Sequence, residues 1–285
     1  MRSRTGLLSQ SSLLALLALA ETVFGRAALA GDLATDFAGA ESRVALPAVS
    51  GVNAKIGSFG ASLDGEGAGG AFFGVALPLG QRFGAQLDGL VGTSQGGNTF
   101  RGAAGHLFWR DPARALLGIY ASHVQWDVDA GTSGRSEVNK VGLESQLYLG
   151  RFTLEGLSAY QFGSDRGFTG KGTLAFYPLD DLRLHVGVTQ YEGPGFGAFT
   201  GLEWAPRPGG SMSMFADVGV DEDRDVRAVF GLRFYLAGSD KSLIRRHRED
   251  DPEVDLPSDL FHTTGSSSAC PPGQTLVNGF CDGNT

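Results

Sequence analysis

The sequence predicts an all-β protein that folds as a closed antiparallel up-and-down transmembrane β-barrel of about 12 strands. Three observations support this prediction. Apolar and polar residues alternate over most of the chain, short and long connections separate the alternating segments in turn, and aromatic residues gather near the segment ends. The composition agrees, since 44 of the 285 residues are glycine, about twice the usual share and without the period of collagen.

Composition also excludes several classes of protein. A net charge of −8 argues against a nucleic-acid-binding protein. With 2 cysteines the chain is neither a disulfide-dense scaffold nor a typical zinc ribbon. Beyond the N-terminus no apolar run is long enough for a helix to span a membrane. We expect no cofactor, no metal site and no catalytic residue, because G-x-S-x-G, Walker and H-E-x-x-H motifs are all missing.

Residues 1–30 have the pattern of a secretory signal peptide. A basic start precedes an apolar run at 13–20, and small residues follow up to the A-x-A motif that ends at Ala30. The alternative is a short core helix. We therefore expect cleavage after Ala30, and we treat 31–51 as a separate segment that precedes the barrel and could enter its lumen.

Strands are expected wherever apolar and polar residues alternate with a period of two. The segment 226–236 shows the pattern well, with Val226, Phe230 and Phe234 on one face and Arg227 and Arg233 on the other. The predicted strands cover 52–62, 70–79, 82–93, 99–110, 114–126, 137–149, 151–163, 168–178, 182–192, 195–205, 211–221 and 225–236. In 114–126 two phases are open, and in 52–62 Gly and Ser blur the phase.

The connections between these strands are of two kinds that alternate along the chain. Tight turns lie at 80–81, 111–113, 150–151, 179–181 and 207–210. Longer, polar, Gly-rich loops lie at 64–69, 94–98, 127–136, 164–167, 192–195 and 221–224. An even number of strands with short turns at one end and longer loops at the other is the layout of an outer-membrane barrel.

Aromatic residues near both strand ends share the parity of the apolar face. They are Phe73, Phe83, Trp109, Phe152, Tyr160, Phe162, Phe168, Phe176, Phe196, Trp204 and Phe234. Two belts of rings that bound a band of Leu, Val and Ala indicate a membrane girdle, because aromatic rings favour the boundary between hydrocarbon and headgroups. The alternative is a soluble barrel or sandwich whose apolar face points inward, but such a core gives no reason for rings at both strand ends.

On these features the chain resembles Gram-negative outer-membrane β-barrel proteins of the porin-like kind. The resemblance covers 52–236 and includes the final strand 226–236, which looks like the assembly signal that such barrels present to the outer-membrane insertion machinery. It implies a location in the outer membrane, lipid and lipopolysaccharide as partners, and a periplasmic position for 31–51. It also implies a narrow channel for small solutes; a filled structural or adhesin-like barrel is the alternative.

If the polar faces point inward, charged and amide side chains of both signs line the lumen. The candidates are Gln86, Asp88, Lys140, Glu144, Gln146, Glu155, Gln161, Lys171, Arg183, His185, Glu203, Asp217, Arg227 and Arg233. One interpretation is a narrow wet pore whose charges select solutes; the other is a filled interior in which the charges pair. Twelve strands lie between the filled barrels of about eight and the open channels of about sixteen.

Some twelve-stranded outer-membrane barrels are phospholipases, so a lipid hydrolase is a further alternative. That chemistry needs a serine activated by a histidine on the lipid-facing surface. No His-x-Ser occurs, and the nearest arrangement pairs His123 with Ser145 on the next strand, about four residues out of register. We therefore expect no enzymatic activity.

Beyond the barrel, 237–285 changes composition to a basic run, then an acidic run, with Pro252 and Pro257 as helix breakers. We expect a flexible periplasmic tail. Near its end Cys270 and Cys281 are predicted to form a disulfide in an oxidising compartment, in preference to a metal site.

Overall fold

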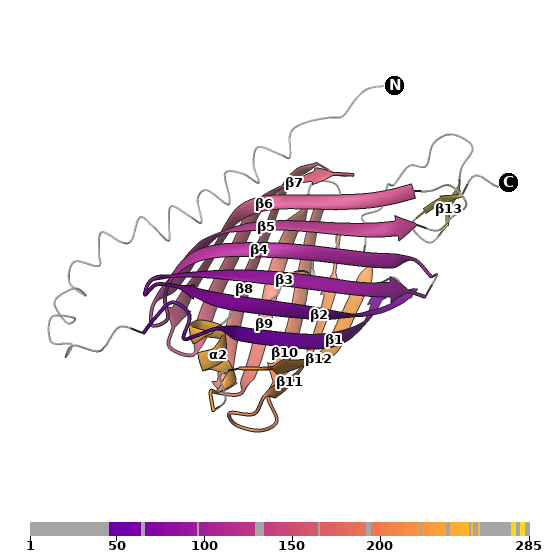
Figure 1. Cartoon of the computed structure of the whole chain (residues 1–285). Helices are drawn as coiled ribbons and strands as arrows, with labels where there is room; N and C mark the ends of the chain where they lie inside the picture. Colours follow the sequence, from indigo (N-terminus) through magenta and orange to yellow (C-terminus); the bar gives the residue numbers. More distant parts are fainter. Residues whose placement is uncertain are drawn as a thin grey trace. The chain divides into compact units, whose positions relative to one another are not determined.

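The computed structural model describes residues 46–63, 66–95, 97–128, 134–164, 166–191, 195–222, 224–237, 240–250, 252, 256, 275–277 and 280–282. Its main body is a closed antiparallel barrel in which each strand pairs with its neighbours in sequence, and β1 pairs with β12 (Figure 1). The strands are β1 (Asn53–Leu63), β2 (Glu66–Leu79), β3 (Phe83–Ser94), β4 (Thr99–Asp111), β5 (Ala115–Val128), β6 (Gly134–Leu149), β7 (Phe152–Gly163), β8 (Gly167–Leu179), β9 (Leu182–Tyr191), β10 (Gly195–Trp204), β11 (Met212–Val220) and β12 (Val226–Tyr235). The predicted fold class is confirmed.

The strand boundaries differ from the predicted ones mainly at the end with the longer loops, which we call the long-loop end; the opposite end is the short-turn end. At the long-loop end β2 begins at Glu66 rather than at residue 70, and β6 begins at Gly134 rather than at 137. The reason is that ladder pairing continues beyond the apolar band, as in the register pair of Leu63 with Glu66. The described part of the chain holds no helix long and apolar enough to cross a membrane.

Large apolar side chains cover the outer face of the barrel. Leu143, Val188 and Phe230 are exposed by 60%, 59% and 64%. Inward positions on the same strands hold polar residues such as Lys140 and Arg183, which are almost completely buried. The alternative of a soluble barrel with an apolar interior is therefore wrong, because an apolar exterior on a closed sheet matches a lipid environment.

The open phase of β5 is settled by rings inside the barrel. Leu117 and Ile119 point outward, whereas Tyr120 and Trp126 are buried inside. The Trp126 ring packs against Phe100 at a centroid distance of 4.6 Å. Both residues belong to a larger group of buried side chains, which we call the inner aromatic cluster. Its other members are Phe59, Ala61, Phe72, Leu90, Ala104, Tyr120, Val124, Phe215, Val229 and Leu256.

Cross-strand glycines make room for these inner rings. A Cβ on Gly92 would lie 2.2 Å from Cζ of Phe100, its register partner, and a Cβ on Gly57 would lie 2.2 Å from Cζ of Phe72. Each ring therefore lies over the backbone of a glycine on the next strand, which is a recurrent way to pin register in a sheet. The sequence prediction missed the inner aromatic cluster.

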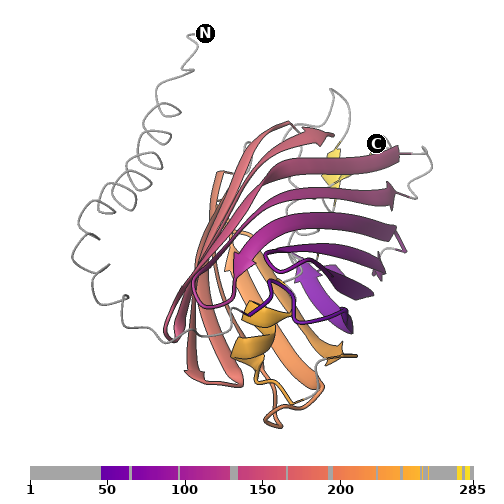
Figure 2. The ribbon, with the colours of Figure 1, turned by 60° about the vertical axis from the view of Figure 1, so that its left-hand side comes forward.

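Within the predicted tail 237–285, the described residues 240–250 contain a helix. Leu243–Glu249 form the helix α2, which lies at the short-turn end of the barrel (Figure 2). The Leu243 and Ile244 amides donate to Asp181 Oδ1 at 3.1 Å and to the Asp180 carbonyl at 3.0 Å, in the β8–β9 turn. The first turn of α2 is thus anchored by a turn of the barrel, which explains why a charged segment forms an ordered helix.

Residues just before β1 close the same end of the barrel. The Ala48 amide donates to the Gln81 carbonyl at 2.8 Å, and the Ser50 amide donates to the Glu249 carbonyl at 2.9 Å. Val49 is buried in an inner cluster with Phe108. The described part of the predicted segment 31–51 therefore enters the short-turn end of the lumen.

A short antiparallel hairpin, β13 (Thr275–Val277) and β14 (Phe280–Asp282), lies near the C-terminus. In its register Leu276 faces Cys281. Cys270 lies outside the described residues, as do residues 1–30, so the predicted disulfide and the predicted signal peptide stay predictions.

Candidate functional site: the lumen and its C-terminal segment

The C-terminal segment enters the lumen beyond α2. The carbonyl oxygen of Pro252 accepts a hydrogen bond from Lys55 Nζ on β1 at 2.6 Å and one from Gln86 Nε2 on β3 at 3.3 Å. Leu256 is completely buried as a member of the inner aromatic cluster. We call α2, Asp250, Pro252 and Leu256 together the plug segment.

Polar contacts attach α2 to the inner wall. The His247 Nδ1 atom lies 2.9 Å from the Tyr177 hydroxyl oxygen, and Arg248 Nη2 donates to the Phe152 carbonyl at 3.0 Å. In turn Arg110 Nη1 donates to the Arg248 carbonyl at 3.0 Å. Burial lowers the pKa of Arg248 from its ordinary value. These bonds come from β4, β7 and β8, so α2 is held on several sides of the lumen.

Arg246 joins α2 to the turn between β10 and β11. Its guanidinium is buried and donates to the carbonyls of Gly210 and Ala237, each at 3.2 Å. It also lies over the Tyr235 ring at 4.6 Å from the centroid, within the range of a cation–π contact. This buried cation with carbonyl partners fixes the orientation of the helix.

Ion pairs stabilise the C-terminal end of α2. Arg245 Nε donates to Glu249 Oε1 at 2.8 Å, and Lys241 Nζ lies 3.3 Å from Glu249 Oε2 and bonds Asp250 as well. Burial alone would raise the pKa of Glu249. The hydrogen bond from Arg245 and the charge of Lys241 outweigh burial and lower this pKa below its ordinary value of 4.5.

One ionic network crosses β3, β4 and β6. His106 Nε2 lies 3.0 Å from Asp88 Oδ2, and His106 Nδ1 lies 2.8 Å from Glu144 Oε2. Gln86 Nε2 also donates to Asp88 Oδ2 at 2.9 Å. Because Gln86 also bonds Pro252, this network is continuous with the plug segment.

A second network crosses β7, β9 and β11. Arg183 Nη2 donates to both carboxylate oxygens of Glu155, at 3.1 and 3.0 Å, and Arg183 Nη1 donates to His185 Nδ1 at 2.9 Å. His185 Nε2 lies 2.5 Å from Asp217 Oδ1. A hydrogen bond between two charged groups is shorter and stronger than a neutral one, so the pair of Arg183 with Glu155 stabilises this side of the wall.

Glu203 on β10 is the centre of a third network. Its carboxylate accepts from Ser213 Oγ at 2.5 Å, from Arg233 Nη1 at 2.6 Å and from the Tyr235 hydroxyl at 2.9 Å. His247 Nε2 of α2 lies 3.4 Å from Glu203 Oε2. The anion is thus compensated by the wall and faces the helix.

The remaining lumen candidates also lie on inward positions of the strands. Lys140 lies over the Tyr191 ring and Lys171 over the Phe199 ring, each at 5.3 Å. Gln146 Oε1 accepts from the Tyr148 hydroxyl at 2.8 Å. Two further candidates are a buried Gln161 and Arg227, which pairs with Asp221 at 2.7 Å.

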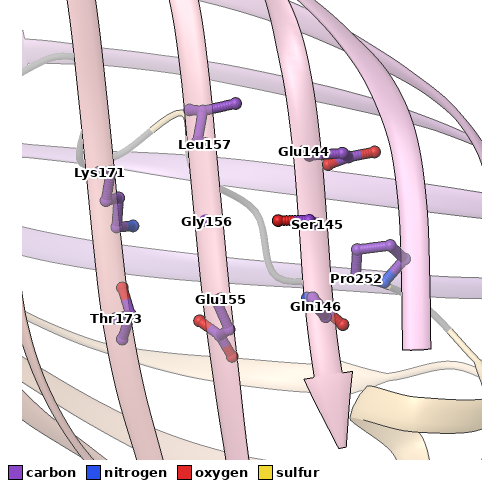
Figure 3. A pocket seen from close by; sticks show the side chains of 9 residues that line it. All are labelled: Glu144, Ser145, Gln146, Glu155, Gly156, Leu157, Lys171, Thr173 and Pro252. Atoms are coloured by element: carbon purple, nitrogen blue, oxygen red, sulfur yellow. The ribbon is translucent and has the colours of Figure 1, made fainter. Parts of the chain in front are cut away.

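An open pocket remains between the plug segment and one side of the wall. Its empty space, with the solvent at its open side included, is about 410 Å³. Its lining residues are Glu144, Ser145, Gln146, Glu155, Gly156, Leu157, Lys171, Thr173 and Pro252 (Figure 3). Side chains of both charge signs border this space, and most of them are half-buried. Among the described residues, no group of three or more His, Cys, Asp and Glu is arranged to hold a metal ion.

The predicted girdle residues all lie on outward positions. Phe152 stacks on Phe176 at a centroid distance of 4.7 Å near the short-turn end, and Tyr160 meets Phe168 edge to face at 5.2 Å near the long-loop end. The others are Phe73, Phe83, Phe162, Phe196, Trp204 and Phe234, which are exposed, and Trp109, which is half-buried beside its register partner Phe83.

The structure adds lumen residues that the sequence prediction missed. They are Lys55, His106 and Arg110, all buried and all in contact with the plug segment or with a network that reaches it. The parity of β4 could have found His106 and Arg110, because they alternate with the outward Leu107 and Trp109. Lys55 lies in β1, where Gly and Ser blur the alternation of apolar and polar residues.

On the outer face His123 and Asn139 form a cross-strand pair. His123 Nδ1 lies 2.8 Å from Asn139 Oδ1, and the two residues are register partners on β5 and β6. Ser145 instead pairs with Leu117, so it lies six positions along β6 from Asn139. The hypothetical pair of His123 with Ser145 therefore does not form.

The architecture and its polar, closed interior define a porin-like outer-membrane β-barrel fold. No family model and no curated protein sequence matches this chain. Among solved structures, it is similar to the KdgM porin in complex with disordered oligogalacturonate, at 12% identity over 63% of this chain and 98% of that chain, with a TM-score of 0.50. It is also similar to the Acinetobacter baumannii outer membrane protein Omp33, at 8% identity over 64% of this chain and 97% of that chain, with a TM-score of 0.43. Outer membrane phospholipase A from Escherichia coli matches at 12% identity over 67% of this chain and 98% of that chain, with a TM-score of 0.43. At these identities the likeness is one of fold.

Proposed function

We propose that this protein is an outer-membrane barrel of a Gram-negative bacterium that forms a narrow channel for small polar solutes, and that its own plug segment holds the channel closed at rest. The observation that carries the proposal is the pair of hydrogen bonds from Lys55 and Gln86 to the Pro252 carbonyl inside the lumen. Its expected partners are outer-membrane lipid, lipopolysaccharide and the insertion machinery.

The chemistry of the plug contacts favours reversible closure. They include single hydrogen bonds from wall side chains to backbone carbonyls of the plug segment, as between Arg110 and Arg248, and from plug side chains to the wall, as between Arg248 and Phe152. Such bonds contribute about 1–3 kcal/mol each, because water replaces them on release. The wall that faces α2 and Pro252 is polar, so water can wet that part of the lumen once the segment leaves.

The pocket supports a solute path along this side of the wall. Glu144, Glu155 and Lys171 border space beside Pro252 that the plug segment does not fill. Carboxylates and an ammonium along one wall suit small solutes that carry polar groups of either sign. The paired networks on the wall keep those side chains in place.

Conductance in planar bilayers tests the proposal. The full mature chain should be silent, and a chain that ends at Ala237 should show discrete unitary conductance. The matched control ends at Leu256, retains the plug segment and should stay silent. Heat-dependent migration on SDS gels shows whether each barrel is folded.

A folded but silent chain that ends at Ala237 would contradict the channel and favour a filled structural or adhesin-like barrel. The inner aromatic cluster favours that second candidate, because Phe59, Phe72 and Phe100 fill part of the lumen with rings. To exclude the possibility that this truncation misfolds, the full chain with Lys55→Met and Gln86→Leu provides a second readout, in which bursts of conductance are expected.

A lipid hydrolase has less support. The register and same-face neighbours of His123 are Ala103, Ala121 and Gln125, besides Asn139, and none of them offers a hydroxyl nucleophile. We expect no release of fatty acid from labelled phospholipid. Turnover that is lost in His123→Ala would overturn this expectation.

A further inference from the structure

The plug segment runs through the lumen in one direction. It begins with α2 at the short-turn end, where the Ile244 amide bonds the Asp180 carbonyl. At Pro252 it meets Lys55 and Gln86, which lie two and three residues from the short-turn ends of β1 and β3. The chain has therefore left the short-turn end by Pro252 and lies within the lumen.

Leu256 lies further along the same path. It belongs to the inner aromatic cluster, which extends to Phe100 and Trp126, one and two residues from the long-loop ends of β4 and β5. A strand rises about 3.3 Å per residue, so the cluster reaches within about 7 Å of the long-loop ends. Another 29 residues follow Leu256 in the sequence. Because an extended residue spans up to about 3.5 Å, a few of them suffice to reach the long-loop rim.

Buried side chains already fill the short-turn end of the lumen. At the short-turn end Ala48 and Val49 are buried, and Leu243 and Arg246 of α2 are buried beside the turns. The Ser50 amide bonds the Glu249 carbonyl, so the N-terminal segment and α2 close this end together. A chain that turned back after Leu256 would have to pass these side chains.

From the positions of Pro252 and Leu256 we infer that the chain leaves the barrel at the long-loop end, on the cell surface. The two chain ends of the barrel then lie on opposite sides of the outer membrane, although the even number of strands returns β12 to the side of β1. The barrel thus displays its own cysteine-containing C-terminus to the exterior. This inference rests on the outer-membrane location within the proposed function and not on channel activity.

Cysteine labelling on intact cells tests the inference. The background carries Cys270→Ser and Cys281→Ser, and each variant adds one cysteine. Thr285→Cys reports the C-terminus, Gln95→Cys reports the exposed β3–β4 loop at the long-loop end, and Arg207→Cys reports the exposed β10–β11 turn at the short-turn end. The reagent is a polyethylene-glycol maleimide too large to cross the outer membrane.

We expect Thr285→Cys to be labelled on intact cells as fully as Gln95→Cys, and Arg207→Cys only after the outer membrane is permeabilised. Labelling of Thr285→Cys that follows Arg207→Cys would overturn the inference and leave the proposed channel standing. If Gln95→Cys is also protected on intact cells, the outer-membrane orientation itself fails, and with it both proposals. Heat-dependent migration on SDS gels confirms in each case that the barrel is folded.

Discussion

The Lys55 ammonium on β1 donates a 2.6 Å hydrogen bond to the carbonyl oxygen of Pro252, which lies 197 residues further along the chain. Lys55 is a buried cation at the beginning of the barrel, and Pro252 belongs to the segment that follows the barrel. The contact joins the two ends of the barrel sequence inside the lumen. Lys55, a polar residue of the lumen wall, therefore helps to hold the plug segment in the lumen.

Removing the two donors to Pro252 should loosen the plug segment. In Lys55→Met combined with Gln86→Leu the Pro252 carbonyl loses both bonds, and an unsatisfied buried acceptor costs about 1–3 kcal/mol. Each 1.4 kcal/mol changes an equilibrium about tenfold, so the open probability in bilayers should rise at least several-fold. Lys140→Met is the control, because Lys140 lies over the Tyr191 ring, and its open probability should match the unaltered chain.

Glu203 should contribute strongly to the stability of the barrel. Glu203→Ala removes the carboxylate that the buried Arg233 guanidinium contacts at 2.6 Å, and removal of one member of a buried pair destabilises by about 3–5 kcal/mol. The temperature at which the folded band converts on SDS gels should fall clearly. Asp180→Ala breaks the exposed pair of Asp180 with Arg151 and should lower it little, by a contribution of about 0–1 kcal/mol. Equal effects of the two substitutions would contradict this prediction.

The outer face should respond to charge according to depth in the bilayer. Leu143 lies between the two girdles, and Leu143→Arg should destabilise the barrel by about 2–4 kcal/mol, because arginine is most costly near the midplane. Val220 is the last residue of β11 at the long-loop end, and Val220→Arg should cost about 0–1 kcal/mol. Urea unfolding in lipid vesicles measures both. Similar stabilities for the two variants would argue against a lipid-facing Leu143.

Acid should weaken the attachment of α2. The pKa of Glu249 is lowered in the folded protein, so its contribution to stability is complete above the ordinary value of 4.5 and is lost as the pH falls through the lower folded value. Conductance of the full chain should therefore increase as the pH falls below the ordinary value of 4.5 and stay absent at neutral pH. In Glu249→Gln that part of the pH dependence should vanish. A pH response that is unchanged in this variant would assign it to other groups.

The barrel itself follows from local pattern. A strand in a membrane barrel must present apolar side chains to lipid at every second position, so Leu143 and Val188 reveal their face without knowledge of any neighbour. The girdle rings are equally local, since their position depends only on the distance from a strand end. For this reason the number of strands and most of the outward residues were predictable.

The sequence predicts less well which side chains point into the lumen and how they pair there. In β5 both parities carry apolar residues, and the choice between Ile119 and Tyr120 as the outward residue depends on the rings of neighbouring strands. Trp126 points inward because Phe100 on β4 packs against it. Pairing partners among the lumen charges, such as Arg183 with Glu155, likewise depend on register, which comes from the assembled sheet.

The sequence alone determined a closed sheet with an apolar exterior, because alternation with a period of two is a property of each strand by itself. The tertiary structure decided what fills the interior. A run of arginines and acidic residues with prolines has the composition of a solvated linker, and its order comes from partners in distant strands, such as Arg110 and Lys55. Those partners come together only when the barrel closes. The position of the segment after β12 therefore depends on the three-dimensional arrangement and not on its composition.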